Sequence, residues 1–427
     1  MSRRFLVSIF LADLTSLGIA LVVSLWLVFG AYGPFGLTVP EGNSLWPFVG
    51  LMVGGAILGS WFNGLAWGNA MPRPSYGRAA GIVAFAAAFT AVGLILTRAY
   101  WSRPFFALTV VIWFGLAIAH RAIRRRRPWT DDMVILTTEH QLVRDIEEGD
   151  HANVLAVLGP RDEPPGDSLP VGATLVIDLR AVLSEDMARF ASSSSIAGNP
   201  VRAFSTVYEE HTGRIPMAHL AEGWELARPV ARSSYAPFKR ALDILISILL
   251  APVWILLGAI VWLIVKIDSS GPAIYRQERV GRNERPFTLY KFRTMIPHAE
   301  PDGPKFATVN DPRITTVGRF LRKSRLDEIP QFWNVLRGDL ALVGPRPERP
   351  VFVEQFEQSI PFYGSRHLIR PGVTGWAQVN YGYADDEADT VEKLTFDLYY
   401  VKHSTLWLDL HILGMSIWTV VSGFGAR

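Results

Sequence analysis

The sequence of 427 residues contains no cysteine. This absence excludes disulfide bonds, thiolate metal sites and a cysteine nucleophile. Four histidines of the C-terminal part show no metal-ligand spacing and are interpreted as ordinary side chains: His298, His367, His403 and His411.

The sequence also lacks a large excess of charge. Its 42 lysines and arginines and 39 acidic residues leave a formal net charge of +3. The basic residues concentrate between residues 276 and 349, which suits anionic headgroups and a nucleotide diphosphate better than nucleic acid. We therefore expect membrane lipids as partners and no nucleic acid.

Apolar residues, in contrast, are abundant. They make up 49% of the chain, too much for an ordinary soluble enzyme. Four apolar stretches precede residue 125, and each is near the ~20 residues that a membrane span requires: 5–29, 46–65, 79–96 and 105–119. We predict a four-helix transmembrane module over residues 1–127.

Arginines mark one side of these segments: Arg3, Arg4, Arg73, Arg78, Arg121 and residues 124–127. The positive-inside rule therefore places both ends of the module in the cytoplasm. The run at 124–127 is interpreted as a topology anchor rather than a nucleic-acid contact. The first segment is too long for a cleaved signal peptide. Asp13 lies in this segment, close enough to its cytoplasmic end that we expect it to be solvated.

Residues 128–228 have the pattern of a soluble α/β domain. Short apolar strands are predicted at 133–137, 154–158, 174–179 and 201–204, with helices at 139–148 and 185–191. A small doubly wound sheet follows from this order, and the serine run 192–195 is predicted as a loop. No G-x-G-x-x-G follows any strand, which argues against dinucleotide binding. A structural, oligomerising or regulatory role is preferred, and ligand binding stays open.

The segment at 321–348 holds two adjacent acids, Asp327 and Glu328, in a dense field of arginines. Arg322, Lys323 and Arg325 are expected to keep a neighbouring carboxylate ionised and to clamp a phosphate that it attacks. A proline and a glycine, at 330 and 338, bracket a short helix over about 329–336. An alternative of equal weight on residue types alone is that Asp327 caps this helix among solvated arginines.

The apolar segment at 242–267 is long enough to span a membrane, yet basic residues flank both of its ends. A simple crossing would place the basic region that follows on the outer side. Pro252 removes a backbone donor and can break the helix. We therefore predict a re-entrant helix hairpin that dips into one leaflet.

Several stretches, in this order, resemble the bacterial polyprenyl glycosylphosphotransferases, also called monotopic phosphoglycosyl transferases. The stretches are FKRALD (238–243), GPAIYRQERVG (271–281), YKFRTM (290–295), DPRIT (311–315), the Asp-Glu segment (321–348) and RPGVTGWAQ (370–378). The likeness covers residues 235–427, and such a series is highly specific. The region 348–383 looks like enzymes that start exopolysaccharide synthesis.

The resemblance implies transfer of a sugar 1-phosphate from a UDP-sugar to undecaprenyl phosphate, with release of UMP. It implies that Asp327 is the nucleophile, that Glu328 is its catalytic partner, and that the helix bent at Pro252 re-enters the membrane. From the acid pair among arginines we also expect Mg²⁺ as the cofactor, with Asp327 as its ligand. Ala251 replaces the family's usual small polar residue before that proline, and Ala341 replaces a usual serine. The expected substrate-binding residues are Lys291, Arg293, Arg313, Arg322, Pro345, Arg346, Pro347 and Arg370.

The expected architecture is a membrane protein of the α + α/β class in the bacterial inner membrane. It comprises the transmembrane module (1–127), a Rossmann-like α/β domain (128–228), a linker (229–237) and a monotopic catalytic domain (238–427). The last apolar segment, 406–424, contains Asp409 and His411 and is expected to form a packed or interfacial helix. Neither the sugar nor the oligomeric state follows from the sequence, and a homo-oligomer is compatible with it.

Two alternatives stay open at this point. The first is a non-catalytic membrane scaffold or regulator of polysaccharide assembly, against which the intact Asp327–Glu328 pair argues. The second is a glycosyltransferase that moves a sugar without its phosphate. The nucleotide product distinguishes this second alternative, because it releases UDP rather than UMP.

Overall fold

The computed structural model describes residues 3–30, 45–67, 76–97, 102–125, 130–149, 151–166, 169–170, 172–222, 235–296, 299, 311–381 and 387–422. The chain divides into two compact units, Met1–Trp129 and Thr130–Arg427.

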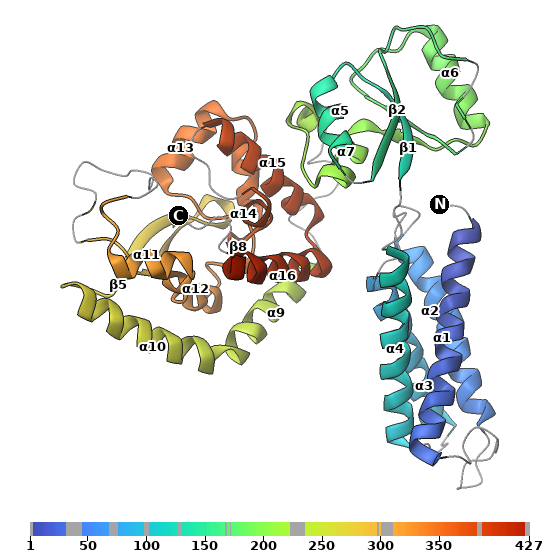
Figure 1. The fold of residues 1–427 in the computed structure, drawn as a ribbon, viewed down its shortest axis with the longest axis horizontal. Coiled ribbons are helices and arrows are strands. Elements are labelled where there is room, and N and C mark those ends of the chain that lie inside the picture. The colour runs from blue at the N-terminus through green and yellow to red at the C-terminus, as the bar shows by residue number, and fades with distance from the viewer. Residues whose placement is uncertain are drawn as a thin grey trace. The chain divides into compact units, whose positions relative to one another are not determined.

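In its described residues, the first unit is a bundle of four helices (Figure 1). They are α1 (Arg3–Phe29), α2 (Trp46–Trp67), α3 (Tyr76–Leu96) and α4 (Arg103–Arg125). Helices α1, α3 and α4 are long and apolar enough to cross a membrane, and the Trp46–Trp61 part of α2 is a shorter apolar helix. Small residues allow close approach of α2 and α3, since a Cβ atom on Gly55 would lie 2.8 Å from Ala86 Cα. The predicted apolar helices are confirmed, and this is a membrane protein.

Asp13 is not solvated as expected, but is 4% exposed inside this bundle. Arg121 Nη2 donates to its Oδ2 atom at 2.7 Å, and His120 Nε2 lies 2.8 Å from its Oδ1 atom. Trp113 Nε1 donates to the main-chain oxygen of Asp13. The expectation failed because a partner on α4, 108 positions along the chain, neutralises the acid.

The second unit begins with a parallel sheet of order β2-β1-β3-β4. Its elements are β1 (Asp131–Leu136), α5 (His140–Glu147), β2 (Ala152–Leu158), β3 (Thr174–Ile177), α6 (Glu185–Ile196), β4 (Val201–Ala203), α7 (Phe204–Thr212) and the 3₁₀ helix η2 (Met217–Glu222). Alternate residues of β1 pack on opposite sides, Met133 and Ile135 with α5 and α7, and Val134 and Leu136 with α6. The predicted parallel sheet is confirmed.

The serine run 192–195 lies within α6, so its prediction as a loop is wrong. Ser184 caps the helix by accepting a hydrogen bond from the Met187 N–H. Ser194 is buried, and its hydroxyl oxygen accepts a hydrogen bond from the Leu169 N–H. A tertiary partner therefore outweighs the low intrinsic helix propensity of serine.

In the described residues, the rest of this unit is built on four longer helices, α9, α10, α15 and α16, and several short elements. They are α9 (Tyr235–Leu249), α10 (Ala251–Asp268), β5 (Ile274–Val280), η4 (Arg282–Glu284), β6 (Pro286–Phe292), α11 (Thr316–Lys323), η5 (Leu326–Glu328), α12 (Gln331–Arg337), β7 (Ala341–Val343), α13 (Pro350–Ser359), η6 (Tyr363–Leu368), β8 (Gly372–Thr374), α14 (Trp376–Asn380), α15 (Glu387–His403) and α16 (Leu406–Ser422). Strands β5 and β6 form an antiparallel hairpin, and β7 pairs with β8 in parallel. Of the predicted linker, residues 235–237 belong to α9, and 229–234 lie outside the described residues.

The chain changes direction between α9 and α10 (Figure 1). Leu250 separates the two helices, and Pro252 stands in the first turn of α10. Across the bend, Trp254 Nε1 donates to the main-chain oxygen of Ser247 at 3.0 Å. The predicted helix break near Pro252 is confirmed. Helix α10 is also long and apolar enough to cross a membrane. Only 11% of its 18 residues are buried inside the structure.

Helix α16 is packed, as expected, around its acid. Asp409 is buried and receives hydrogen bonds from Lys239, Tyr235 and Tyr400, each at 2.6 Å. This buried anion links α16 to α9 and α15.

Candidate active site

The two adjacent acids lie in η5, between α11 and α12. Arg325 precedes them in the left-handed conformation, with φ of 56°, and its main-chain oxygen accepts from the Glu328 N–H. Pro330 immediately precedes α12, and Gly338 (φ 94°) ends it. The predicted short helix after Asp327 is confirmed, with bounds at 331 and 337.

Helix α10 packs against this segment. Trp254 of α10 stacks on Phe332 of α12 with ring centroids 5.8 Å apart, and Ile329 lies against Gly258. Val261 and Val265 of α10 join the same apolar cluster as Ile329. The acids therefore sit beside the most apolar helix of the unit, and they are themselves only 7% and 8% exposed.

The carboxylate of Glu328 pairs with three basic side chains of the site. Its Oε1 atom lies 3.1 Å from Lys291 Nζ, 3.4 Å from Arg346 Nη1 and 3.8 Å from Arg325 Nη1. Burial by itself would raise the pKa of the Glu328 carboxyl, but these three cations outweigh it and lower that pKa to about 2. The Glu328 carboxyl is therefore ionised at neutral pH.

Asp327 has a different environment. Its Oδ1 atom is buried, and no described residue donates a hydrogen bond to it. Burial, followed by the negative charge of Glu328, raises the pKa of Asp327 to about 6, although Lys291, Arg322 and Arg325 oppose the rise. The expectation that nearby arginines would lower this pKa is wrong, because those cations do not offset burial and the adjacent anion. Asp327 is thus a weakly solvated carboxylate above pH 6, and its Oδ1 atom accepts no hydrogen bond from the described residues.

The turn that carries Arg346 is fixed through its main chain. Four consecutive carbonyl oxygens, at positions 345 to 348, accept hydrogen bonds of 2.9 Å from four different groups: the Gly372 N–H, Arg366 Nη2, Arg279 Nη1 and the Val280 N–H. Arg366 also binds Asp397 at 2.7 Å in a buried ion pair. The turn therefore presents the Arg346 guanidinium to Glu328 from a rigid base.

The predicted substrate-binding cations occupy two kinds of position. Lys291, Arg322 and Arg346 surround the acids, and Arg322 Nε is held by Thr294 Oγ1 at 2.9 Å. The other three bind elsewhere: Arg293 to the Ser269 main chain and hydroxyl, Arg313 to Asp311, and Arg370 to the Gly338 main chain.

Two arginines that were not expected at the site, Arg279 and Arg366, contribute to it. Arg325, which was expected beside the acids, lies 3.8 Å from Glu328 Oε1. Arg279 and Arg366 fix the turn that carries Arg346. No local pattern indicates that role, because their acceptors are main-chain oxygens 68 and 20 positions away.

Comparison with known proteins identifies the family. A model of the family described as bacterial sugar transferase matches residues 234–423. The chain is 40% identical over 191 residues to UDP-glucose:undecaprenyl-phosphate glucose-1-phosphate transferase of Caulobacter vibrioides, which covers 43% of this chain and 70% of that protein. The chain belongs to the bacterial sugar transferase family.

Two other relatives are matched over less than two thirds of their own length. The chain is 44% identical over 254 residues to the UDP-N-acetylgalactosamine-undecaprenyl-phosphate N-acetylgalactosaminephosphotransferase of Aeromonas hydrophila, covering 59% of this chain and 60% of the relative. It is 44% identical over 194 residues to UDP-glucose:undecaprenyl-phosphate glucose-1-phosphate transferase of Escherichia coli, covering 44% of this chain and 40% of the relative. The match to the family model contains the acid pair, the Arg346 turn and both helices α9 and α10.

Proposed function

We propose that this protein transfers a sugar 1-phosphate from a UDP-sugar to undecaprenyl phosphate and so initiates the assembly of an exopolysaccharide or glycoconjugate repeat unit. The observation that carries the proposal is the difference between the surroundings of the two adjacent acids. Glu328 forms ion pairs with Lys291, Arg346 and Arg325. Asp327 has a buried oxygen that accepts no hydrogen bond from the described residues. The names of the relatives support this donor and acceptor.

In the first step, a carboxylate oxygen of Asp327 attacks the sugar-proximal phosphorus of the donor. The new bond joins this oxygen to phosphorus, the bond between phosphorus and the bridging diphosphate oxygen breaks, and UMP leaves with the electron pair. An aspartyl-phosphosugar anhydride remains. The pKa of about 6 supports this role, because Asp327 is ionised at neutral pH yet is less stabilised as an anion than an ordinary aspartate.

In the second step, a phosphate oxygen of undecaprenyl phosphate attacks the same phosphorus. The bond between Asp327 and phosphorus breaks, which regenerates the carboxylate and releases undecaprenyl-diphosphate-sugar. Lys291, Arg322 and Arg346 are positioned to stabilise the charge that develops on the phosphoryl oxygens. Their approach to the acids from three separate segments supports this role.

We also propose that Mg²⁺ is the cofactor of the reaction. A buried carboxylate oxygen without a donor in the described part of the chain fits a hard cation, so Asp327 would hold the ion and Glu328 would orient the site. When bound, the ion supplies charge neutralisation of the diphosphate.

We further propose that α9 and α10 form a re-entrant hairpin in the cytoplasmic leaflet of the inner membrane. The break at Leu250 and the exposed apolar side chains of α10 support this arrangement. The packing of Trp254 on Phe332 would bring a membrane-dissolved acceptor to the acid pair. The α/β region is assigned a structural or regulatory role with a Rossmann-like fold, on the cytoplasmic side.

The test is nucleotide release from purified protein in lipid nanodiscs with Mg²⁺ and undecaprenyl phosphate. The donors are UDP-glucose, UDP-galactose and UDP-N-acetylgalactosamine, and the variants are Asp327→Asn and, as a matched control, Asp186→Asn on the exposed surface of α6. The expected product is UMP from at least one donor with wild type and the control, and none with Asp327→Asn. Release of UDP would instead indicate glycosyl transfer without the phosphate, and no release from any donor would favour the scaffold role.

A further inference from the structure

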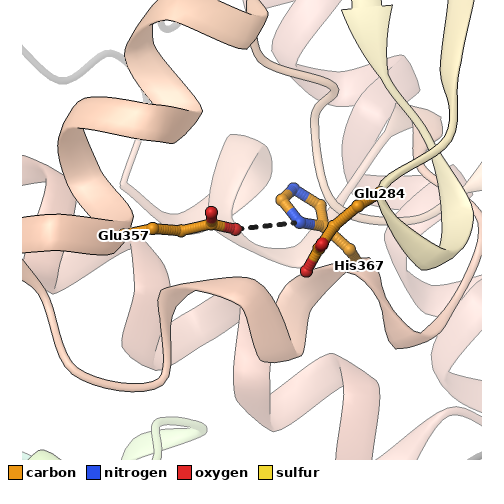
Figure 2. A group of neighbouring side chains, drawn as sticks. All are labelled: Glu284, Glu357 and His367. Carbon is orange, nitrogen blue, oxygen red and sulfur yellow. Dashed lines mark ion pairs between the residues drawn. The ribbon is translucent and has the colours of Figure 1, made fainter.

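Three side chains outside the acid pair converge from separate segments. Glu284 comes from η4 at the tip of the β5–β6 hairpin, Glu357 from α13 and His367 from η6. One ligand atom of each lies within 4.8 Å of those of the other two, and Figure 2 shows both carboxylates beside the imidazole. The transfer mechanism uses none of the three.

His367 is the buried member of this cluster, at 7% exposure. Its Nδ1 atom is buried and has no hydrogen-bond partner among the described residues, and Glu357 Oε1 lies 3.9 Å away (Figure 2). Burial, together with the charge of Arg366, lowers the pKa of His367 to about 3. The ring is therefore neutral, with a nitrogen lone pair available as a ligand. A buried polar atom left without a partner is costly, so a ligand at this point would recover free energy.

Among the residues that the structure describes, neither Glu284 nor Glu357 pairs with a lysine or arginine. Burial, and then the negative charge of Glu284, raise the pKa of Glu357. A divalent cation between the two groups would remove this repulsion.

Gly364 leaves room for the cluster. A Cβ atom at this position would lie 3.2 Å from Glu284 Oε1 and 3.3 Å from Glu357 Oε1, tighter than ordinary contact. Glu284 itself has φ of 60°, a left-handed conformation that asparagine and glycine adopt more readily than glutamate. Position 284 thus carries a glutamate although its left-handed backbone conformation favours asparagine or glycine.

We propose that Glu284, Glu357 and His367 bind one divalent metal ion of the zinc class. One imidazole nitrogen and two carboxylate oxygens are ligands that Zn²⁺ accepts, with water completing a tetrahedral set. Both glutamates are exposed, so rotation of their side chains can bring the ligand atoms to the separation of about 3.3 Å found around a bound zinc ion.

The ion would join the hairpin tip to α13 and η6. The hairpin carries Lys291, and η6 carries Arg366, which fixes the turn of Arg346. The site is therefore structural, and it stabilises the frame that presents two cations to the acid pair.

The experiment uses the untagged full-length protein in nanodiscs, stripped with a chelator and then incubated with Zn²⁺ in excess Mg²⁺. Excess Mg²⁺ suppresses binding at purely oxygen-lined sites. After gel filtration, metal per protein is measured by plasma mass spectrometry for wild type, Glu284→Gln, Glu357→Gln and His367→Asn. Glu354→Gln, another exposed glutamate of α13, is the matched control.

Wild type and Glu354→Gln are expected to retain one zinc ion per chain more than the three cluster variants. Zinc should also raise the melting temperature of wild type and leave that of Glu357→Gln unchanged. Because the two glutamates are exposed, their variants should fold even if buried His367→Asn does not. Equal zinc in wild type and both glutamate variants, or no zinc retained by wild type, would overturn the proposal.

Discussion

Lys291 Nζ lies 3.1 Å from Glu328 Oε1, so the cation of β6 binds the second acid of the pair and leaves the first acid without that hydrogen bond. This pairing makes Glu328 the electrostatic centre of the site. The charge of Glu328 is also one of the causes that raise the pKa of its neighbour Asp327.

Glu328→Gln should therefore lower the pKa of Asp327. The substitution removes an adjacent negative charge and releases Lys291 to act on Asp327, and both effects favour the ionised form. We expect the acid midpoint of the rate profile to move down by about one pH unit, together with a lower maximum rate. The measurement is UMP release as a function of pH, and an unchanged or higher midpoint would contradict this coupling.

In the wild-type protein, activity should rise with pH through a single transition near pH 6. Asp327 must be deprotonated to attack phosphorus, and its pKa is raised to about 6. Glu328, with a pKa lowered to about 2, stays ionised throughout this range and contributes no transition. The profile of kcat/KM for the donor between pH 5 and 8 checks this, and a flat profile across pH 6 would refute it.

Asp327→Asn should make the folded protein more stable at pH 8 while abolishing turnover. An acid whose pKa is raised on folding destabilises the native state increasingly as pH rises above its unfolded value, and this cost is complete above the folded pKa of about 6; the neutral amide removes it. We expect a gain on the order of 2 kcal/mol at pH 8, and a smaller gain at pH 5, where the native carboxyl is protonated. Thermal or denaturant unfolding in detergent measures it.

The control for this stability measurement is Asp186→Asn. This acid is exposed and forms a surface pair with Arg189. Such pairs contribute little to stability, so its unfolding curve should match that of wild type. A loss of stability in Asp327→Asn at pH 8 would mean that the buried carboxylate is compensated in the folded state.

Arg293 and Arg346 should respond differently to replacement by lysine. Arg293 Nη2 donates to both the main-chain oxygen and the hydroxyl of Ser269, at 2.7 and 2.9 Å, and so anchors the end of α10. Arg293→Lys should lower stability by about 1 to 2 kcal/mol with little change in the KM for the donor.

Arg346→Lys should raise the donor KM or lower kcat with a smaller loss of stability, because it replaces a planar fork at the proposed phosphate site. The two readouts are the melting temperature and donor kinetics of both variants. If Arg293→Lys impaired donor binding without loss of stability, Arg293 would instead contact the substrate.

Much of the fold could be predicted from the sequence, because periodicity and length are local signals. The apolar helices of the first unit, the four strands of the parallel sheet and the helix break near Pro252 were all found in this way. The prediction failed where a distant partner decides the outcome. Asp13 is paired by Arg121, and Ser194 of α6 accepts a hydrogen bond from the Leu169 main chain.

Of the cations predicted for the candidate site, Lys291, Arg322 and Arg346 lie beside the acid pair, but the predicted direction of the Asp327 pKa was wrong. The density of arginines around Asp327 suggested a low pKa, whereas burial against α10 and the charge of Glu328 raise it. Burial depends on tertiary packing, which residue spacing does not encode. His367 was interpreted as ordinary for the same reason, since its neighbours Glu284 and Glu357 approach it only after the hairpin and α13 fold.

The most direct test of the account is peptide mass spectrometry of the protein after incubation with the active UDP-sugar and Mg²⁺ in the absence of undecaprenyl phosphate. The account predicts a sugar-phosphate adduct on the peptide that contains Asp327, its loss on later addition of undecaprenyl phosphate, and no adduct in Asp327→Asn. Stoichiometric UMP release without any adduct, or an adduct on another residue, would contradict Asp327 as the nucleophile.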